Sequence, residues 1–390
     1  MCKYNKLFDC YLHIVEDKIL KRKFSYTEFK NIINKHQTQF EYTPIGKSVN
    51  QLSINSYTIG SGKTKILLWS QMHGNEPSCT LALLDIMNYL ESEDAKPLLQ
   101  QVTIKIIPLL NPDGNEIFSR RNALGIDLNR DAQALVSPES QILNKIAQEF
   151  KPEFAFNLHD QEQYYTTLPC RKQTIISFLS PKSSAEETIP PQREKAMKVI
   201  SEAYSFINQY IPNQIGKYND DFTPTAFGEK LTMMGISTIL VECGAKKDDI
   251  NRIFPRKIVC LSIIRMLQSI ANKDYTNADI NIYKNIPNNI RDNTFDLLIK
   301  NITVEQNNYT FKADIGIRRY KGTNIEDFAD YSNIFRIEGF GDLSQYGGIN
   351  IYDATNDIIK QNNTINIGEI ANINIQTPQG NNITIQELLK

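Results

Sequence analysis

Short apolar runs alternate with segments of helical spacing between residues 51 and 270, and this alternation constrains the fold more than any other feature. Strands alternating with helices are typical of βαβ units, in which helices cover both faces of a largely parallel or mixed sheet. The sequence therefore predicts an α/β fold with a mixed, mostly parallel sheet flanked by helices. The runs that predict its buried strands are 65–69, 102–110, 154–158, 175–179 and 237–241, and the main predicted helices are 77–89, 194–211 and 249–270.

Three of these predicted strands lead into residues with metal-binding or acid–base chemistry. His73 and Glu76 follow the first, His159 ends the third and Glu242 ends the last. A His-x-x-Glu spacing alone is a weak signal, but open α/β sheets place their chemistry at the carboxyl ends of strands. Two imidazoles and one carboxylate are the donor set of a catalytic zinc site. The pattern therefore favours a metal site at this edge of the sheet.

The N-terminal segment 1–45 is predicted to be mainly helical, with a helical pattern from about Leu7 to Phe40. Within it, Ser25 and Glu28 have the spacing of a capping box. Residues 51–59 alternate as a strand, and glycines at 60 and 62 predict a tight turn back into the run 65–69. We expect these two strands to form a hairpin.

The sequence Gly-Ser-Gly-Lys-Thr at 60–64 invites comparison with a phosphate-binding loop. That loop needs a glycine where this chain has Tyr57, and it must open a helix whose N-terminus binds the phosphate. Here the loop leads into a strand. The sequence therefore excludes nucleotide binding at this place.

Beyond about Lys273 the chain becomes rich in asparagine and isoleucine, with short alternating segments separated by turns. We predict a catalytic domain over 1–275 and a small β-rich domain over 285–390. The predicted strand segments of the second domain are 301–304, 310–315, 334–337, 349–352, 365–367 and 371–375.

The charge balance excludes several classes of partner. With 43 basic and 44 acidic residues, the net charge of −1 creates no field that would attract nucleic acid or an anionic membrane. The N-terminus lacks the apolar core of a signal peptide and no apolar run is long enough to span a bilayer, so we expect a cytoplasmic protein. A lipoprotein leader trimmed before Cys2 is left open. The six cysteines form no Cys-x-x-Cys pair, which argues against a structural zinc cluster.

Two further motifs complete the set around the strand ends. Residues 111–114 read Asn-Pro-Asp-Gly, and 125–130 read Gly-Ile-Asp-Leu-Asn-Arg. With the His-x-x-Glu, the later histidine and the late glutamate, in this order over about 45–270, the chain closely resembles the bacterial branch of the zinc metallocarboxypeptidases of the carboxypeptidase A type. The resemblance implies a carboxypeptidase-like sheet and zinc-dependent removal of C-terminal residues from peptides.

The resemblance also implies a role for each matched residue. One zinc ion per chain would be bound by His73, Glu76 and His159, with a fourth position for water. Glu242 would be the general base, and Arg120 would hold the oxyanion of the scissile carbonyl. Asn129 and Arg130 would bind the terminal carboxylate of the substrate, and Tyr218 would be the mobile tyrosine of the family, a third substrate-binding residue.

Some assignments stay open at this stage. The segment before Arg130 is short, so Arg121 competes with Arg120 for the oxyanion role, and Asp160 is either a partner of the metal ligands or a helix N-cap. Side-chain preference depends on the stretch 218–235, where Asp221, Thr225 and Glu229 are candidates.

Alternative functions also remain. One is a zinc deacylase of acyl-amino acids, of the aspartoacylase or succinylglutamate desuccinylase type, and another is an amidase of cell-wall peptides. A non-catalytic binding protein is disfavoured because every catalytic position is intact. The expected partner is therefore a peptide or an acyl-amino acid.

Overall fold

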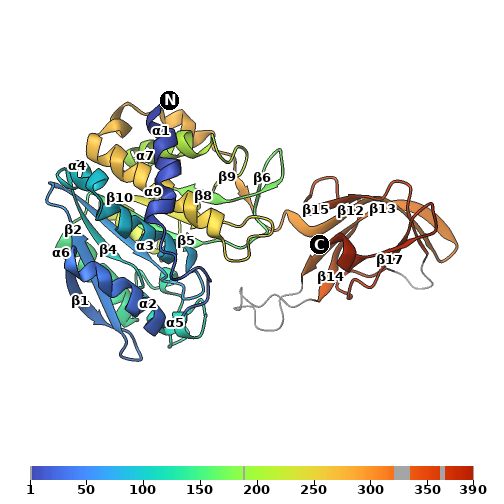
Figure 1. Ribbon diagram of the computed structural model, residues 1–390, viewed down its shortest axis with the longest axis horizontal. Coiled ribbons are helices and arrows are strands. Elements are labelled where there is room, and N and C mark those ends of the chain that lie inside the picture. Colours follow the sequence, from blue (N-terminus) through green and yellow to red (C-terminus); the bar gives the residue numbers. More distant parts are fainter. Residues whose placement is uncertain (1, 188, 320–333, 361–364, 390) are drawn as a thin grey trace. The chain divides into compact units, whose positions relative to one another are not determined.

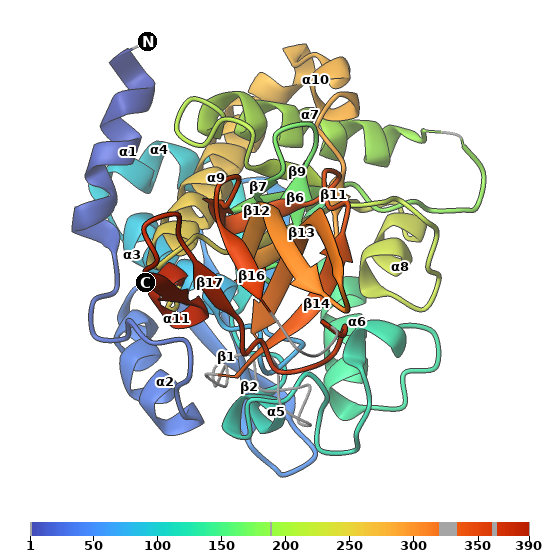
Figure 2. The same cartoon turned by 90° about the vertical axis from the view of Figure 1, so that its right-hand side faces the viewer.

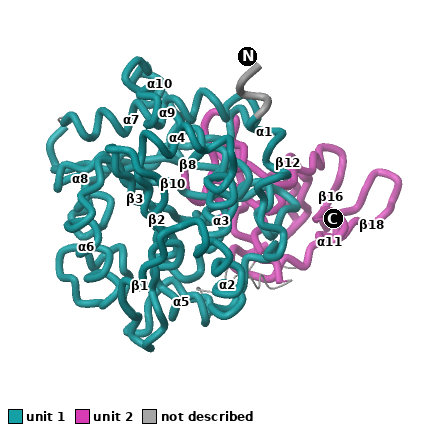
Figure 3. The backbone as a smooth tube through the Cα atoms, turned by 60° about the vertical axis from the view of Figure 1, so that its left-hand side comes forward, with its two compact units in different colours: residues 1–162, 174–289 teal, residues 163–173, 290–390 magenta. Residues whose placement is uncertain are grey.

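The computed structural model describes residues 2–187, 189–319, 334–360 and 365–389, in two compact units. The first unit comprises residues 1–162 and 174–289, and the second comprises 163–173 and 290–390 (Figure 3). Each unit has its own apolar core.

A mixed sheet forms the centre of the first unit (Figure 1). It has eight strands in the order β1-β2-β4-β3-β5-β10-β8-β9. The four central strands β4, β3, β5 and β10 are parallel, whereas β2 runs antiparallel to β4 and β8 antiparallel to β10. The predicted fold class is confirmed. The strands are β1 Glu41–Lys47, β2 Ser53–Ile59, β3 Thr64–Ser70, β4 Val102–Ile107, β5 Phe154–Asp160, β8 Ile176–Leu179, β9 Ile215–Lys217 and β10 Ser237–Cys243.

Helices cover both faces of this sheet. On β3, Ile66 and Leu68 enter the core formed with α3, α7 and α9, while Leu67 and Trp69 enter the core formed with α6 and α8. Both faces are apolar because neither is open to water. The helices are α1 Cys2–Ile14, α2 Tyr26–Ile33, α3 Ser78–Leu90, α4 Lys96–Leu99, α5 Pro112–Glu116, α6 Pro138–Phe150, α7 Pro191–Ile207, α8 Phe227–Met233, α9 Ile253–Asn272 and α10 Ile280–Lys284, with short 3-10 turns at Asn34–Thr38, Glu93–Ala95, Leu128–Arg130 and Asp274–Asn277.

The N-terminal segment is less helical than its pattern predicted. The capping box of Ser25 and Glu28 is present and begins α2, but residues 15–25 between α1 and α2 are not helical. The backbone of this stretch forms hydrogen bonds with buried side chains instead. The Glu16 N–H donates to Asp85, and Arg256 donates to the carbonyls of Glu16 and Ile19. These contacts with α3 and α9 replace the hydrogen bonds of a continuous helix.

The predicted hairpin between β2 and β3 is wrong, because β4 lies between them. The glycine loop passes close over the chain that enters β4: a Cβ on Gly62 would come within 1.8 Å of the Gln101 carbonyl carbon. The N–H groups of Ser61 and Gly62 donate to the carbonyls of Leu99 and Val102. The glycines thus allow the connection from β2 to β3 to pass close to the start of β4, and they do not form the tight turn of a hairpin.

A seven-stranded sheet forms the second unit, which confirms the predicted β-rich C-terminal region. Its longest strands, β12 and β13, lie side by side and pair antiparallel (Figure 2). β15 and β16 pair parallel with successive halves of β12. The predicted strand at 365–367 is wrong, because Ile367 and Gly368 form a turn. The elements are β12 Thr294–Gln306, β13 Tyr309–Arg319, β14 Phe335–Gly341, β15 Gly347–Asp353, β16 Ile358–Lys360, β17 Asn374–Gln376, β18 Asn382–Thr384 and α11 Ile385–Leu388.

A hairpin from the middle of the chain also belongs to the second unit. It is formed by β6 Thr166–Thr167 and β7 Lys172–Gln173, and β11 Asn289–Ile290 pairs with β6. Within the unit, the Tyr164 hydroxyl donates to Asp296 at 2.7 Å. The chain therefore leaves the first unit shortly after His159 and returns to it at Thr174. The domain boundaries predicted from the sequence, 1–275 and 285–390, remain a prediction.

Among the described helices, none combines the length and the apolar character needed to cross a membrane.

Candidate metal centre

The loop from β3 to α3 presents His73 and Glu76 at the carboxyl edge of the sheet. The Glu76 N–H donates to the His73 carbonyl at 3.1 Å, which closes a turn over these residues. Gly74 lies against the chain at Gly114, where an added Cβ would come within 2.0 Å of the Gly114 carbonyl carbon. Only glycine fits this contact, so the Asn-Pro-Asp-Gly motif fixes the loop that carries the two side chains.

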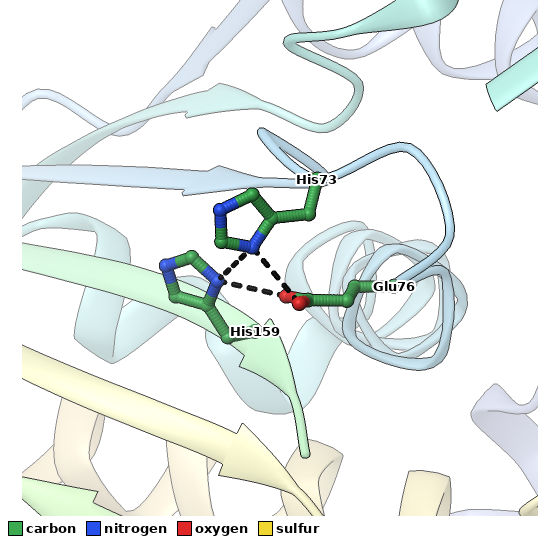
Figure 4. A group of neighbouring side chains, drawn as sticks. All are labelled: His73, Glu76 and His159. Atoms are coloured by element: carbon green, nitrogen blue, oxygen red, sulfur yellow. Dashed lines mark hydrogen bonds and ion pairs between the residues drawn. The ribbon is translucent and has the colours of Figure 1, made fainter. Parts of the chain in front are cut away.

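The side chains of His73, Glu76 and His159 converge (Figure 4). Nδ1 of His73 lies 2.9 Å from Oε1 of Glu76, and Nδ1 of His159 lies 2.8 Å from Oε2. The two imidazole Nδ1 atoms lie 3.1 Å apart, and all three side chains are buried. The structure thus brings together the three residues that the sequence analysis proposed as metal ligands.

Asp127 orients the first of these imidazoles. Its Oδ1 lies 3.0 Å from Nε2 of His73, and its Oδ2 accepts from Nε of Arg120 at 3.1 Å. A carboxylate beside Nε2 holds the proton on that nitrogen, so Nδ1 of His73 keeps its lone pair toward Glu76 and His159. Arg120 also donates from Nη1 to Oε1 of Glu76 at 2.9 Å.

These residues fit a zinc ion. Two nitrogens bound to one tetrahedral zinc, each at its usual bond length, lie about 3.3 Å apart. The 3.1 Å between the Nδ1 atoms of His73 and His159 is close to that spacing. Two imidazole lone pairs that face one another repel unless a cation or a proton lies between them. The carboxylate of Glu76 adds negative charge next to both Nδ1 atoms. The donor set matches catalytic zinc, which leaves a coordination position for water.

The electrostatics of the cluster favour a neutral His159 and an ionised Glu76. At His73, burial is outweighed by the carboxylates of Glu76 and Asp127, which raise the pKa. Burial lowers the pKa of His159, which favours its neutral form. Burial alone would raise the pKa of Glu76, but the two imidazoles hold it well below its usual range. Likewise, burial opposes ionisation of Asp127, yet His73 and Arg120 hold its pKa below the usual range.

Glu242 lies next to the cluster on β10. It is the register partner of His159 across the parallel pair β5 and β10, so both side chains leave the sheet on the same face. Its Oε2 is buried and has no hydrogen-bond partner among the described residues. Burial, and then the carboxylates of Glu76 and Asp160, raise the pKa of Glu242 well above its usual value.

The two candidate oxyanion arginines point to different partners. Arg120 contacts the metal cluster, whereas Nη1 of the exposed Arg121 donates to the Gly125 carbonyl at 3.0 Å. The structure therefore brings Arg120 to the site and turns Arg121 into its own loop.

The predicted substrate-binding residues lie in two places. Oδ1 of Asn129 accepts from the Phe227 N–H at the start of α8, at 3.0 Å, and the exposed Arg130 donates to the Asn129 carbonyl at 2.7 Å. Tyr218 follows β9, where its N–H donates to the Phe178 carbonyl at 3.0 Å. Its role at the site stays a prediction.

Comparison with known proteins identifies the domain. Residues 26–206 match the model of the Peptidase_M14 family, described as zinc carboxypeptidase. The chain contains a zinc carboxypeptidase domain of this family. The resemblance inferred from the sequence motifs is confirmed, and the family supports zinc as the cofactor.

Similar proteins carry carboxypeptidase and peptidase names. The chain is 30% identical over 110 residues to a "Probable carboxypeptidase 2" of Trichophyton verrucosum, covering 27% of this chain and 21% of that protein. It is 31% identical over 107 residues to "Gamma-D-glutamyl-L-diamino acid endopeptidase 1" of Lysinibacillus sphaericus, covering 24% and 27%. The matches thus span only about a fifth to a quarter of these relatives.

A solved structure has the same fold. The structure of a putative carboxypeptidase A from Shewanella denitrificans covers 64% of this chain and 69% of its own, with a TM-score of 0.53 and 17% identity. At this identity the likeness establishes the fold of the zinc carboxypeptidase domain.

Sequence reasoning missed the role of Asp127 in this domain. The residue lies inside the Gly-Ile-Asp-Leu-Asn-Arg motif, where attention fell on Asn129 and Arg130. A carboxylate two residues before a candidate substrate-binding pair was a usable signal, because imidazole ligands of metals are regularly oriented by carboxylates.

Proposed function

We propose that this chain is a zinc-dependent carboxypeptidase that removes C-terminal residues from peptides, with one zinc ion per chain. The proposal rests on one observation. The Nδ1 atoms of His73 and His159 and the carboxylate of Glu76 converge beside Glu242, in a chain that contains a zinc carboxypeptidase domain.

The residues divide the chemistry of amide hydrolysis among them. A zinc ion held by His73, Glu76 and His159 would polarise the scissile carbonyl and lower the pKa of a bound water. The carboxylate of Glu242 accepts the proton of the attacking water and returns it to the leaving amine. Arg120 donates to the oxygen on which negative charge develops.

An exposed arginine in the turn that follows Asp127 supports recognition of a free C-terminus. The planar fork of a guanidinium binds a carboxylate through two charge-assisted hydrogen bonds, which a neutral group does not reproduce. Arg130 is exposed, and Asn129 holds the first turn of α8 next to it. We assign Arg130 and Asn129 to the terminal carboxylate of the substrate, and Tyr218 to contact with the scissile region.

A comparison of two peptides tests the proposal. Wild-type protein should hydrolyse a peptide with a free C-terminus and lose most of its activity on the same peptide amidated. Arg130→Ala should be slow on both peptides, because the variant no longer supplies the charged fork that binds the terminal carboxylate. Arg121→Ala is the matched control: it removes an exposed arginine of the same loop, which donates to Gly125, and should leave the discrimination intact.

Three outcomes would contradict the proposal. Equal wild-type rates on the free and amidated peptides would show that the protein does not recognise the terminal carboxylate and would indicate an endopeptidase. Faster hydrolysis of acyl-amino acids than of any peptide would indicate a deacylase with the same zinc chemistry. Metal analysis that finds no zinc in the purified wild-type protein would remove the proposal altogether.

A further inference from the structure

An arginine from the N-terminal segment reaches the back of the metal cluster. Arg22 lies in the non-helical stretch between α1 and α2, before residues 26–206 that match the family model. Its side chain is only 6% exposed. Nη2 donates to Oδ2 of Asp160 at 3.1 Å, and Nε lies 3.3 Å from the hydroxyl oxygen of Ser78.

Asp160, the partner of Arg22, connects the two elements that carry Glu76 and His159. It follows His159 directly, and because successive side chains of a strand point to opposite faces, its carboxylate lies on the α3 side of the sheet. Its oxygens accept the N–H groups of Ser78 at 3.0 Å and Cys79 at 3.2 Å, the first residues of α3. Asp160 thus accepts the first N–H groups of the helix that follows Glu76, although the N-cap residue of α3 is Pro77.

Further contacts around this carboxylate run to the ligands themselves. The Asp160 N–H donates to Oε2 of Glu76 at 3.2 Å, and Sγ of Cys79 lies 3.0 Å from the carbonyl oxygen of His159. A shift of Asp160 would therefore move Glu76 and His159 relative to one another.

Removing Arg22 would leave Asp160 poorly compensated. The next cation, Nη1 of Arg252, lies 4.0 Å from Oδ2 of Asp160 and already donates to the carbonyl of Cys243 at 2.8 Å. A buried carboxylate that loses its close partner must rearrange to find water or another donor. The rearrangement would act on the end of β5 and the start of α3.

We propose that Arg22 is a positioning residue of the metal centre, which holds Asp160 and thereby sets the spacing of Glu76 and His159. The inference rests on the proposed function only in that these two residues bind the metal. It adds to the metal centre a residue from the stretch between α1 and α2, which precedes the region that matches the family model and contains none of the proposed metal ligands.

Metal affinity is the quantity that tests this inference. Arg22→Met keeps much of the side-chain volume and removes the charge, and Arg22→Lys keeps a charge. At a temperature where the metal-free variants are folded, competition with a chelator should give zinc binding about 10–100-fold weaker in Arg22→Met, the range for lost partners of metal ligands. Arg22→Lys should recover part of the loss. With cobalt in place of zinc, the visible absorption bands of Arg22→Met should differ from those of wild type.

Two further variants separate positioning from general stability. Asp160→Asn combined with Arg22→Met removes the unpaired carboxylate, so the double variant should lose less affinity than the sum of the single losses. Arg265→Met is the matched control, because Arg265 is also a buried arginine paired with carboxylates, those of Glu202 and Asp274. It should lower the melting temperature and leave zinc affinity unchanged.

The possible results decide between the proposals. Wild-type zinc affinity and cobalt bands in Arg22→Met, with only a lower melting temperature, would overturn the positioning role while leaving the proposed function intact. If Arg22→Met does not fold, Arg22→Lys decides: unchanged affinity and cobalt bands overturn the role, and weaker binding supports it. A wild-type protein that binds no zinc would overturn both proposals together.

Discussion

Glu242 lies directly beside His159, because the two residues are register partners on the parallel strands β10 and β5. Their proximity is set by the hydrogen-bond register of a buried sheet and does not depend on a loop. The candidate base therefore keeps its position when its own side chain is changed, so its function can be separated from metal binding.

Glu242→Gln should retain zinc and lose turnover. The amide keeps the shape of the side chain but cannot accept the proton of the attacking water, and general-base catalysis typically contributes about 10²–10⁴-fold. We expect kcat to fall by at least that range while metal analysis still finds zinc. Loss of zinc from this variant would show that Glu242 is a ligand.

Asp127→Ala should weaken zinc binding by about 10–100-fold, because His73 loses the carboxylate that holds its proton on Nε2. Chelator competition measures the effect. Asp131→Ala is a control from the same segment, since Asp131 accepts the N–H groups of Val136 and Ser137 before α6. It should lower the melting temperature by removing these bonds and leave zinc affinity unchanged; equal affinity losses in the two variants would contradict the role of Asp127.

Glu229 on α8 should make stability fall as the pH rises. Burial raises its pKa from 4.5 to about 7, so the ionised form destabilises the folded state. A raised acid pKa gives stability that is fully present below pH 4.5 and is lost as the pH rises through 7. Relative to wild type, Glu229→Gln should gain up to about 3 kcal/mol at pH 8.5 and nothing at pH 4, by denaturant unfolding. A difference that does not change with pH would contradict this.

The end of the catalytic domain can be located with two truncations, after residue 272 and after residue 289. All assigned site residues precede residue 243, so the protein ending at 289 should bind zinc and hydrolyse a small substrate. The protein ending at 272 lacks Tyr283, which is buried and whose hydroxyl accepts the Ser180 N–H at 3.0 Å. Losing such a core aromatic residue costs about 3–5 kcal/mol, so this protein should melt at a clearly lower temperature. Equal melting temperatures would support a boundary near 275.

The sequence predicted those features that a local pattern encodes. His159 and Glu242 were recognised because each ends an apolar run, and strand ends meet at one edge of a parallel sheet. The capping box at Ser25 was recognised because its two residues lie within one turn of helix.

Features that depend on distant pairs were not predicted. The crossing of β4 between β2 and β3 follows from contacts of Gly62 with Gln101, which no local signal reports. Arg22 and Asp160 are 138 positions apart in the chain. Such a pair appears only when the sheet and the N-terminal segment are placed in space.

The hairpin at 163–173 has a consequence for how the protein is made and engineered. The second unit combines the hairpin with residues 290–390, which are synthesised only after the intervening stretch 174–289. It is therefore completed only when the end of the chain packs against this earlier hairpin. Such pairing has high contact order and closes a long loop, which slows folding and favours early formation of the zinc-binding sheet. A crossover between homologous genes within the stretch 174–289 would also separate the hairpin from residues 290–390. The second unit is therefore inherited intact only together with the hairpin.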